Sequence, residues 1–129
     1  MYRSLYVSYS GGMMAKEKRS NTIIGKYMPY YYAGASLDFN LIHIDQEYAK
    51  ANGLPGIILQ GMCTMALTAK HLIDNGNPAQ LRSIKVRFLN PVLPEDELIF
   101  DSIANGPDVS VVVKNKNGGR VLKGKATLK

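Results

Sequence analysis

One amphipathic helix, bounded by chain-breaking residues at both ends, constrains the fold of this chain more than any other feature. Between Gly61 and Asp74, apolar residues recur with the spacing of a single helical face. Pro55-Gly56 forms a turn before this segment, Asn75-Gly76 ends it, and Pro78 prevents it from resuming. We therefore predict one buried central helix of about four turns. Its expected apolar face consists of Met62, Met65, Ala66, Ala69, Leu72 and Ile73.

Downstream of this helix the apolar period changes from that of a helix to that of a strand. Ile84, Val86 and Phe88 alternate with basic residues, and residues 97–104 form a second alternating run. Turn signals at residues 105–108 and 117–119 lead into two further strands, over 109–115 and 120–128. We expect the last three strands to form an antiparallel meander.

The amino-terminal region has weaker signals. Residues 5–10 are consistent with one more strand, ended by Gly11-Gly12, and residues 13–21 are expected to form a flexible basic connection. A short helix is expected to start near Ser20 to Thr22. One long central helix against a curved antiparallel sheet of about five strands is an α+β arrangement. A chain of 129 residues buries only about two thirds of its unfolded surface, so we expect a second subunit to complete the core.

Length and composition exclude several classes of protein. The 129 residues predict a single domain over 1–129, with residues 1–22 either an atypical amino-terminal extension or the first strand. The apolar runs are too short to cross a membrane. A single cysteine, Cys63, excludes a disulfide scaffold and a thiolate zinc cluster. The amino terminus does not resemble a secretory signal, so we expect a reducing, cytoplasmic location.

The net charge of +6 is distributed unevenly. Residues 1–27 carry five basic groups and one acid, residues 28–109 carry five and nine, and residues 110–129 carry six basic groups and no acid. Lysine commonly guards strand edges and maintains solubility. The alternative is recognition of a phosphate-bearing substrate or an acidic carrier protein. No nucleic-acid-binding motif accompanies the charge, so a nucleic-acid partner is not expected.

A polar segment holds the candidate chemistry. Asp38, Asn40, His43 and Asp45 lie within eight positions of one another. An imidazole beside a carboxylate is the usual equipment for moving a proton at neutral pH. The alternative interpretation is structural, because Asp38 is also suited to capping a turn, Asn40 to a left-handed conformation, and Asp45 to starting a short helix over 45–51.

Four motifs in this order resemble the MaoC-like hydratase and dehydratase family of hot-dog proteins. They are YAGASxDFNxIHxD from Tyr32 to Asp45, AKxxGLP from Ala49 to Pro55, GMxTM from Gly61 to Met65, and VRFxxPV from Val86 to Val92. The resemblance extends over about residues 23 to 128. It implies the hot-dog fold, in which an antiparallel sheet wraps around one long central helix.

The resemblance also implies an activity, the reversible addition of water to trans-2-enoyl thioesters to give (R)-3-hydroxyacyl thioesters. Asp38 and His43 would be the catalytic pair, and the backbone N–H of Gly61 would bind the thioester oxygen. No cofactor and no metal are implied. Ser36, Asn40 and Gln60 are expected to support the site, and Leu37, Leu41 and Met62 to contact the acyl chain. The family commonly has Gly, Pro and His in place of Leu37, Leu41 and Gln60.

Other functions on the same fold remain open at this stage. A non-catalytic subunit could bind acyl thioesters or support an active partner, and a thioesterase would direct the water to the carbonyl carbon instead. The thioester carrier is either coenzyme A or an acyl carrier protein. The assembly is expected to be a homodimer or larger homo-oligomer, with a heterodimer as the alternative. Cys63 is expected to be a core residue, and His71 to have a helix-dipole or surface role.

Overall fold

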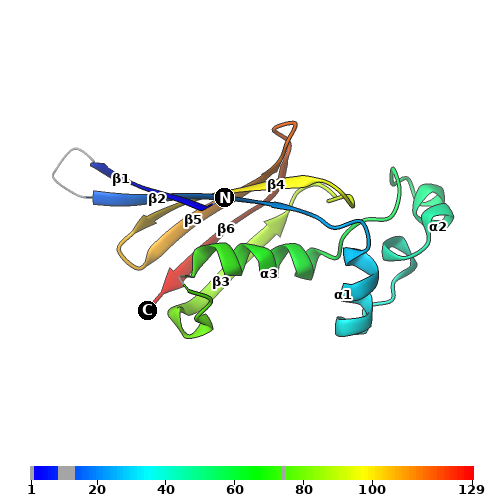
Figure 1. Ribbon diagram of the computed structural model, residues 1–129, viewed down its shortest axis with the longest axis horizontal. Coiled ribbons are helices and arrows are strands. Elements are labelled where there is room, and N and C mark those ends of the chain that lie inside the picture. Colours follow the sequence, from blue (N-terminus) through cyan, green and yellow to red (C-terminus); the bar gives the residue numbers. More distant parts are fainter. Residues whose placement is uncertain (1, 9–13, 74) are drawn as a thin grey trace.

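The computed structural model describes residues 2–8, 14–73 and 75–129, and it contains an antiparallel sheet with α3 across one face (Figure 1). Among these residues, six strands lie in the order β1-β2-β4-β5-β6-β3. α1 and α2 lie beyond one end of the sheet. The elements are β1 (Tyr2–Ser8), β2 (Met14–Ile23), α1 (Met28–Ser36), the 3-10 turn η1 (Leu41–His43), α2 (Gln46–Ala51), α3 (Gly61–Leu72), the 3-10 turn η2 (Pro78–Gln80), β3 (Leu81–Phe88), β4 (Glu97–Asn105), β5 (Asp108–Asn115) and β6 (Arg120–Leu128).

The predicted central helix is confirmed as α3, but the prediction of its buried face is only partly right. Leu72 is buried as predicted, and Met65, Ala69 and Ile73 are half-buried. Met62 is 58% exposed, and Ala66 is exposed as well. Thr64, Thr68 and His71 are also buried, and the polar side-chain groups of Thr68 and His71 are hydrogen-bonded inside the fold. The Thr68 hydroxyl, for example, donates to the Thr64 carbonyl at 2.8 Å. The buried residues of α3 are Cys63, Thr64, Thr68, His71 and Leu72.

The prediction of a flexible connection over residues 13–21 is wrong for the described part of that range. Residues 14–23 form β2, which pairs with β1 on one side and with β4 on the other. Cross-strand polar pairs hold it, including the bidentate contact of Arg19 with Asp101. The helix expected near Ser20 is also wrong, because the first helix begins at Met28, where Pro29 occupies its first turn without cost.

The predicted meander is confirmed, since β4, β5 and β6 are neighbours in that order and antiparallel. β3 then pairs with β6 and forms one edge of the sheet. None of the helices in the described ranges is long and apolar enough to span a membrane. The core lies between α3 and the inner face of the sheet, and its largest fully buried apolar side chains include Phe100, Ile24, Leu98, Leu122, Val111, Val113 and Val121.

His71 joins α3 to two strands and is buried, so the prediction of a surface role for it is wrong. Its Nδ1 lies 2.5 Å from the Ser20 hydroxyl on β2, and its Nε2 lies 2.9 Å from the Ser102 hydroxyl on β4. Burial lowers the pKa of His71 to about 4, with nearby Lys18 acting in the same direction and Asp101 opposing them. The ring is therefore neutral at physiological pH.

We expect this histidine to make the fold sensitive to acid. The pKa of an unfolded histidine is about 6.5, and that of folded His71 is about 4, so between these values the unfolded chain binds a proton that the folded chain does not. The free energy of unfolding should therefore fall as pH drops through this window, with a contribution of up to about 1.4 kcal/mol per pH unit. Urea titrations at several pH values would measure it.

His71→Gln supplies the comparison for the acid experiment. Glutamine keeps a polar group at the position but has no proton to take up between those pH values. The variant should be less stable at neutral pH and should show a shallower dependence on pH than the unsubstituted chain. Equal slopes in the two proteins would contradict the assignment of acid sensitivity to His71.

Candidate active site

His43 is held in a defined tautomer by the backbone. It is the last residue of η1, which Asn40 starts by accepting the Ile42 N–H at 3.3 Å on its side-chain oxygen. The ring is only 7% exposed, and its Nδ1 lies 2.8 Å from the Ile58 carbonyl oxygen. A carbonyl only accepts hydrogen bonds, so Nδ1 carries the proton. In the neutral ring, Nε2 therefore has a lone pair available as a base.

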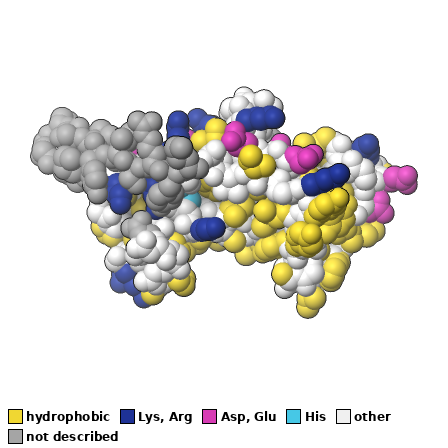
Figure 2. Space-filling view, in the orientation of Figure 1, with side chains coloured by type: hydrophobic (Ala, Val, Ile, Leu, Met, Phe, Trp, Pro, Cys, Tyr) yellow, Lys and Arg dark blue, Asp and Glu magenta, His cyan; other side chains and the backbone are white. Residues whose placement is uncertain are grey.

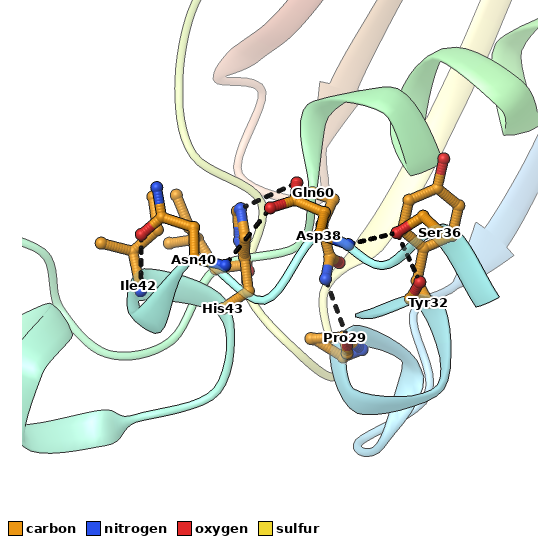
Figure 3. Close-up of polar contacts among 9 residues, drawn as sticks. Pro29, Tyr32, Ser36, Asp38, Asn40, Ile42, His43 and Gln60 are labelled. Atoms are coloured by element: carbon orange, nitrogen blue, oxygen red, sulfur yellow. Dashed lines mark hydrogen bonds and ion pairs between the residues drawn. The ribbon is translucent and has the colours of Figure 1, made fainter. Parts of the chain in front are cut away.

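The carboxylate of Asp38 faces that nitrogen (Figure 3). Asp38 Oδ2 lies 3.7 Å from His43 Nε2, and the Asp38 side chain is 47% exposed. Its other oxygen, Oδ1, accepts the Asn40 N–H at 3.3 Å. The separation is longer than a direct hydrogen bond, and a bridging water molecule within hydrogen-bond distance of both atoms fits it. Sequence analysis predicted this pair, and the structure brings the two side chains together.

Ser36 connects Asp38 to the end of α1. The Ser36 hydroxyl donates to the Tyr32 carbonyl at 2.7 Å and accepts the Asp38 N–H at 3.2 Å. Between them, Leu37 has a left-handed backbone with φ of 64° and ends the helix through its N–H to the Ala33 carbonyl. The left-handed position of this segment is thus Leu37 and not Asn40, whose φ is −53°.

The strain at Leu37 predicts a stabilising substitution. A non-glycine residue in this conformation costs about 1 to 2 kcal/mol, and the Leu37 side chain is 76% exposed, so it loses little packing when removed. Part of this gain in the free energy of unfolding is lost, because glycine has more conformational freedom than leucine in the unfolded chain. We expect Leu37→Gly to raise the free energy of unfolding by about 0.5 to 1 kcal/mol.

Leu41→Gly is the matched control for this prediction, because Leu41 is also exposed but does not have a positive φ. It should lower the free energy of unfolding in the same urea titration. If both substitutions destabilise the protein to the same degree, Leu37 is not strained.

Gln60 and Gly61 form the beginning of α3 next to this pair. Gln60 is 1% exposed, its Nε2 donates to the Pro29 carbonyl at 2.9 Å, and its Oε1 has no hydrogen-bond partner in the described part of the chain. Gly61 is the first residue of the helix. Within the described ranges no acceptor takes its N–H. An unpaired N–H at a helix amino terminus attracts negative charge.

A pocket of about 390 Å³ is lined by His43 and by Gly61 at the start of α3. Asp38 is not part of this lining and contacts His43 from outside it. Leu37, Leu41 and Met62 do not line the pocket either, and their side chains are exposed. The acyl-contact role of these three residues stays a prediction. The pocket is lined by Ile42, His43, Ile58, Leu59, Gly61, Thr64, Phe88, Leu89, Asn90, Pro91, Val92 and Val121.

Sequence analysis did not identify the wall that β3 and the following loop contribute to this pocket. The signal was present in the motif from Val86 to Val92, which was used only for the resemblance. A Cβ atom at position 61 would lie 3.1 Å from the Phe88 ring, so glycine lets this aromatic side chain approach the start of α3. Cys63, by contrast, is buried in the core as predicted, and burial raises the pKa of its thiol.

Chemically, this arrangement offers a base, a neighbouring carboxylate and an N–H donor around a mainly apolar pocket. The family model of the MaoC-like domain matches residues 14–125, which is most of the chain. The chain belongs to the MaoC-like family. This MaoC-like protein is 34% identical over 88 residues to "Enoyl-CoA hydratase 2, peroxisomal" of Arabidopsis thaliana, a match that covers 66% of this chain and 28% of the relative.

The MaoC-like chain is also 46% identical over 76 residues to the peroxisomal hydratase-dehydrogenase-epimerase of Saccharomyces cerevisiae, covering 59% of this chain and 8% of that one. It thus spans less than a third of the length of these two relatives. Both matches agree with the hydratase and dehydratase resemblance seen in the sequence.

Solved structures confirm the predicted α+β hot-dog fold of this MaoC-like protein. The (R)-hydratase from A. caviae superimposes with a TM-score of 0.80 at 21% identity, over 95% of this chain and 98% of that one. The ChsH1-ChsH2 complex from Mycobacterium tuberculosis matches with a TM-score of 0.75 at 22% identity, over 86% of this chain and 91% of that one. At these identities the likeness concerns the fold.

Proposed function

We propose that this MaoC-like protein catalyses the reversible (R)-specific hydration of trans-2-enoyl thioesters. The observation that carries the proposal is the 3.7 Å approach of Asp38 Oδ2 to His43 Nε2, beside a pocket that reaches the first residue of α3. Relatives named enoyl-CoA hydratase 2 in Arabidopsis thaliana and Dictyostelium discoideum support it. The proposed reaction needs no cofactor and no metal.

In the hydration direction, Asp38 and His43 hold one water molecule between them. His43 Nε2 takes a proton from this water while its oxygen bonds to C3 of the enoyl group. The C2–C3 π electrons move toward the thioester carbonyl, and the proton taken from the water is then delivered to C2. Asp38 accepts a hydrogen bond from the water and stabilises the transient imidazolium. Acid-base help of this kind contributes about 10² to 10⁴ in rate.

The thioester oxygen gains negative charge during this step and requires a fixed donor. The N–H of Gly61 is suited to that role, since it begins α3 and lines the same pocket as His43. One such donor is worth about 3 to 4 kcal/mol of transition-state stabilisation. Ser36, Asn40 and Gln60 are proposed to support the site, Ser36 and Asn40 by fixing the loop that carries the pair.

We also propose that the protein acts as an oligomer. Large apolar side chains are exposed around the α1 end of the molecule, where Figure 2 shows hydrophobic atoms at the surface. Tyr31, Leu37, Phe39 and Met62 are each more than half exposed. A second copy would remove these groups from water. The ChsH1-ChsH2 complex is a precedent for the heterodimer alternative, and the expected cytoplasmic location stays a prediction.

A spectrophotometric assay with crotonyl-CoA and longer enoyl-CoA thioesters tests the activity. Loss of the enoyl absorbance, with chiral analysis showing the (R)-3-hydroxyacyl product, is the expected result. Release of free thiol instead would identify a thioesterase. If no enoyl-CoA is consumed until a partner protein is co-expressed, the chain is a partner-dependent subunit and not an independent hydratase.

A further inference from the structure

Basic residues stand directly opposite one another on the outer face of the sheet. Lys85 of β3 pairs in register with Lys125 of β6, and Arg87 pairs with Lys123. All four are exposed, whereas their strand neighbours Ile84, Val86 and Leu122 are partly or fully buried toward α3. A third pair of like charges, Lys114 of β5 with Arg120 of β6, continues the pattern. We call these residues the basic face: Lys85, Arg87, Lys114, Arg120, Lys123 and Lys125.

This arrangement costs stability. Like charges directly opposite each other on neighbouring strands are destabilising. No residue of the basic face forms an ion pair within the described ranges of the chain. The carboxylate of Asp101, which lines a hollow with Lys114 and Arg120, is already held by Arg19. A second carboxylate, that of Asp108, lines a hollow with Lys85 and Lys125 but forms no ion pair with either in the described part of the chain.

Protection of strand edges explains only part of the pattern. β3 is an edge strand, so basic residues on it can prevent unwanted pairing. β6, however, lies between β5 and β3 and has no open edge, yet it contributes three of the six charges. Solubility requires charge at the surface but does not require cations opposite cations. The placement therefore indicates an anionic partner.

The basic face adjoins the candidate active site. Arg87 immediately precedes Phe88, and Lys123 follows Val121 by two residues, while both Phe88 and Val121 line the pocket. β3 therefore carries residues of both features, with Phe88 lining the pocket and Lys85 and Arg87 on the basic face. At about 3.3 Å per residue, Lys85 is only about 10 Å along the strand from Phe88.

We propose that the basic face docks the acidic surface of a carrier protein that delivers the acyl thioester on a phosphopantetheine arm. This inference rests on the proposed function. The charges extend over three strands of an exposed sheet face, an area that suits a complementary protein surface. Electrostatic complementarity of this kind speeds association and selects the partner. A coenzyme A molecule would need only a local phosphate site near the pocket.

Direct binding tests the proposal without relying on turnover. The probe is a purified apo acyl carrier protein labelled with a fluorophore, titrated with this protein and followed by anisotropy. Lys123→Glu/Lys125→Glu should raise the Kd at least about tenfold. Lys50→Glu/Lys70→Glu, the same change in net charge at exposed sites away from the basic face, should change it less than about twofold. No difference between the two double variants would overturn the proposal.

Two further readouts exclude simpler explanations. In Lys123→Glu/Lys125→Glu each glutamate faces a basic residue of β3, so the variant should melt at or above the temperature of the unsubstituted protein. Its kcat/KM for crotonyl-CoA should stay within about twofold. An equal loss with crotonyl-CoA would assign the basic face to coenzyme A phosphates and overturn carrier docking. If the protein binds the carrier but hydrates neither the coenzyme A thioester nor the carrier-bound thioester, the proposed function is contradicted and carrier docking is not.

Discussion

Asp38→Asn is expected to lower kcat for enoyl-thioester hydration by about 10³-fold, because the amide no longer carries the charge that steadies a water molecule and an imidazolium. His43→Gln should have an effect of similar size through loss of the base. The two residues act on one water, so the double variant should be barely slower than either single variant. Crotonyl-CoA assays with each purified variant would measure these losses.

Asp45→Asn is the matched control for the catalytic variants. Asp45 lies two residues after His43, but its carboxylate caps α2 by accepting the Tyr48 N–H at 3.0 Å and takes no part in the proposed chemistry. Its kcat should stay within about twofold of the unsubstituted protein, because a cap contributes to stability and not to catalysis. Activity retained in Asp38→Asn, or lost equally in Asp45→Asn, would contradict the assigned roles.

Gly124→Ala is expected to lower the free energy of unfolding by about 3 kcal/mol, at the upper end of the usual cost of overpacking. A Cβ atom at this position of β6 would lie 2.4 Å from the Lys85 carbonyl oxygen and 2.9 Å from a methyl group of Val86. Main-chain atoms of β3 would have to move, and that strand carries Phe88 into the pocket. Urea unfolding would measure the loss, and kcat/KM should fall with it.

Gly34→Ala provides the opposite case in the same assay. Gly34 lies within α1, has no positive φ, and nothing lies within 4 Å of the position of an added Cβ. Alanine should therefore stabilise the protein by about 0.5 to 1 kcal/mol through its higher helix propensity. If Gly124→Ala were as stable as Gly34→Ala, close packing of β3 on β6 would not be the reason for glycine at position 124.

The strands of the meander could be predicted because their inward positions are apolar apart from a few polar residues such as Ser102. β2 could not, because Lys18 and Ser20, which both contact the α3 region, are polar and hide its alternation. Buried polar residues are also the reason why the buried face of α3 was predicted only in part. The helical spacing of apolar residues selects Met62, but the fold buries His71. The two ring nitrogens of His71 contact the hydroxyl groups of Ser20 on β2 and Ser102 on β4, and these contacts form only in the folded sheet.

The candidate site was predictable as far as it is local in sequence. Asp38 and His43 are five positions apart in one loop, and the loop's own hydrogen bonds set their relation. Phe88 and Asn90 reach the same pocket from a segment far along the chain, and no periodicity in a single sequence reports such a meeting. The strain at Leu37 is equally invisible, because glycine is the usual signal of that backbone conformation.

The register of β2 has a consequence for biosynthesis. Lys16 lies opposite Ala104, so one side of this strand can pair with its neighbour only after β4 has left the ribosome. At about 5 to 20 residues per second the delay is several seconds, during which an open strand is exposed to aggregation. β1, which is adjacent in sequence, shields only one flank. The nascent chain should therefore bind chaperones most strongly after β2 has been synthesised and before β4 has been.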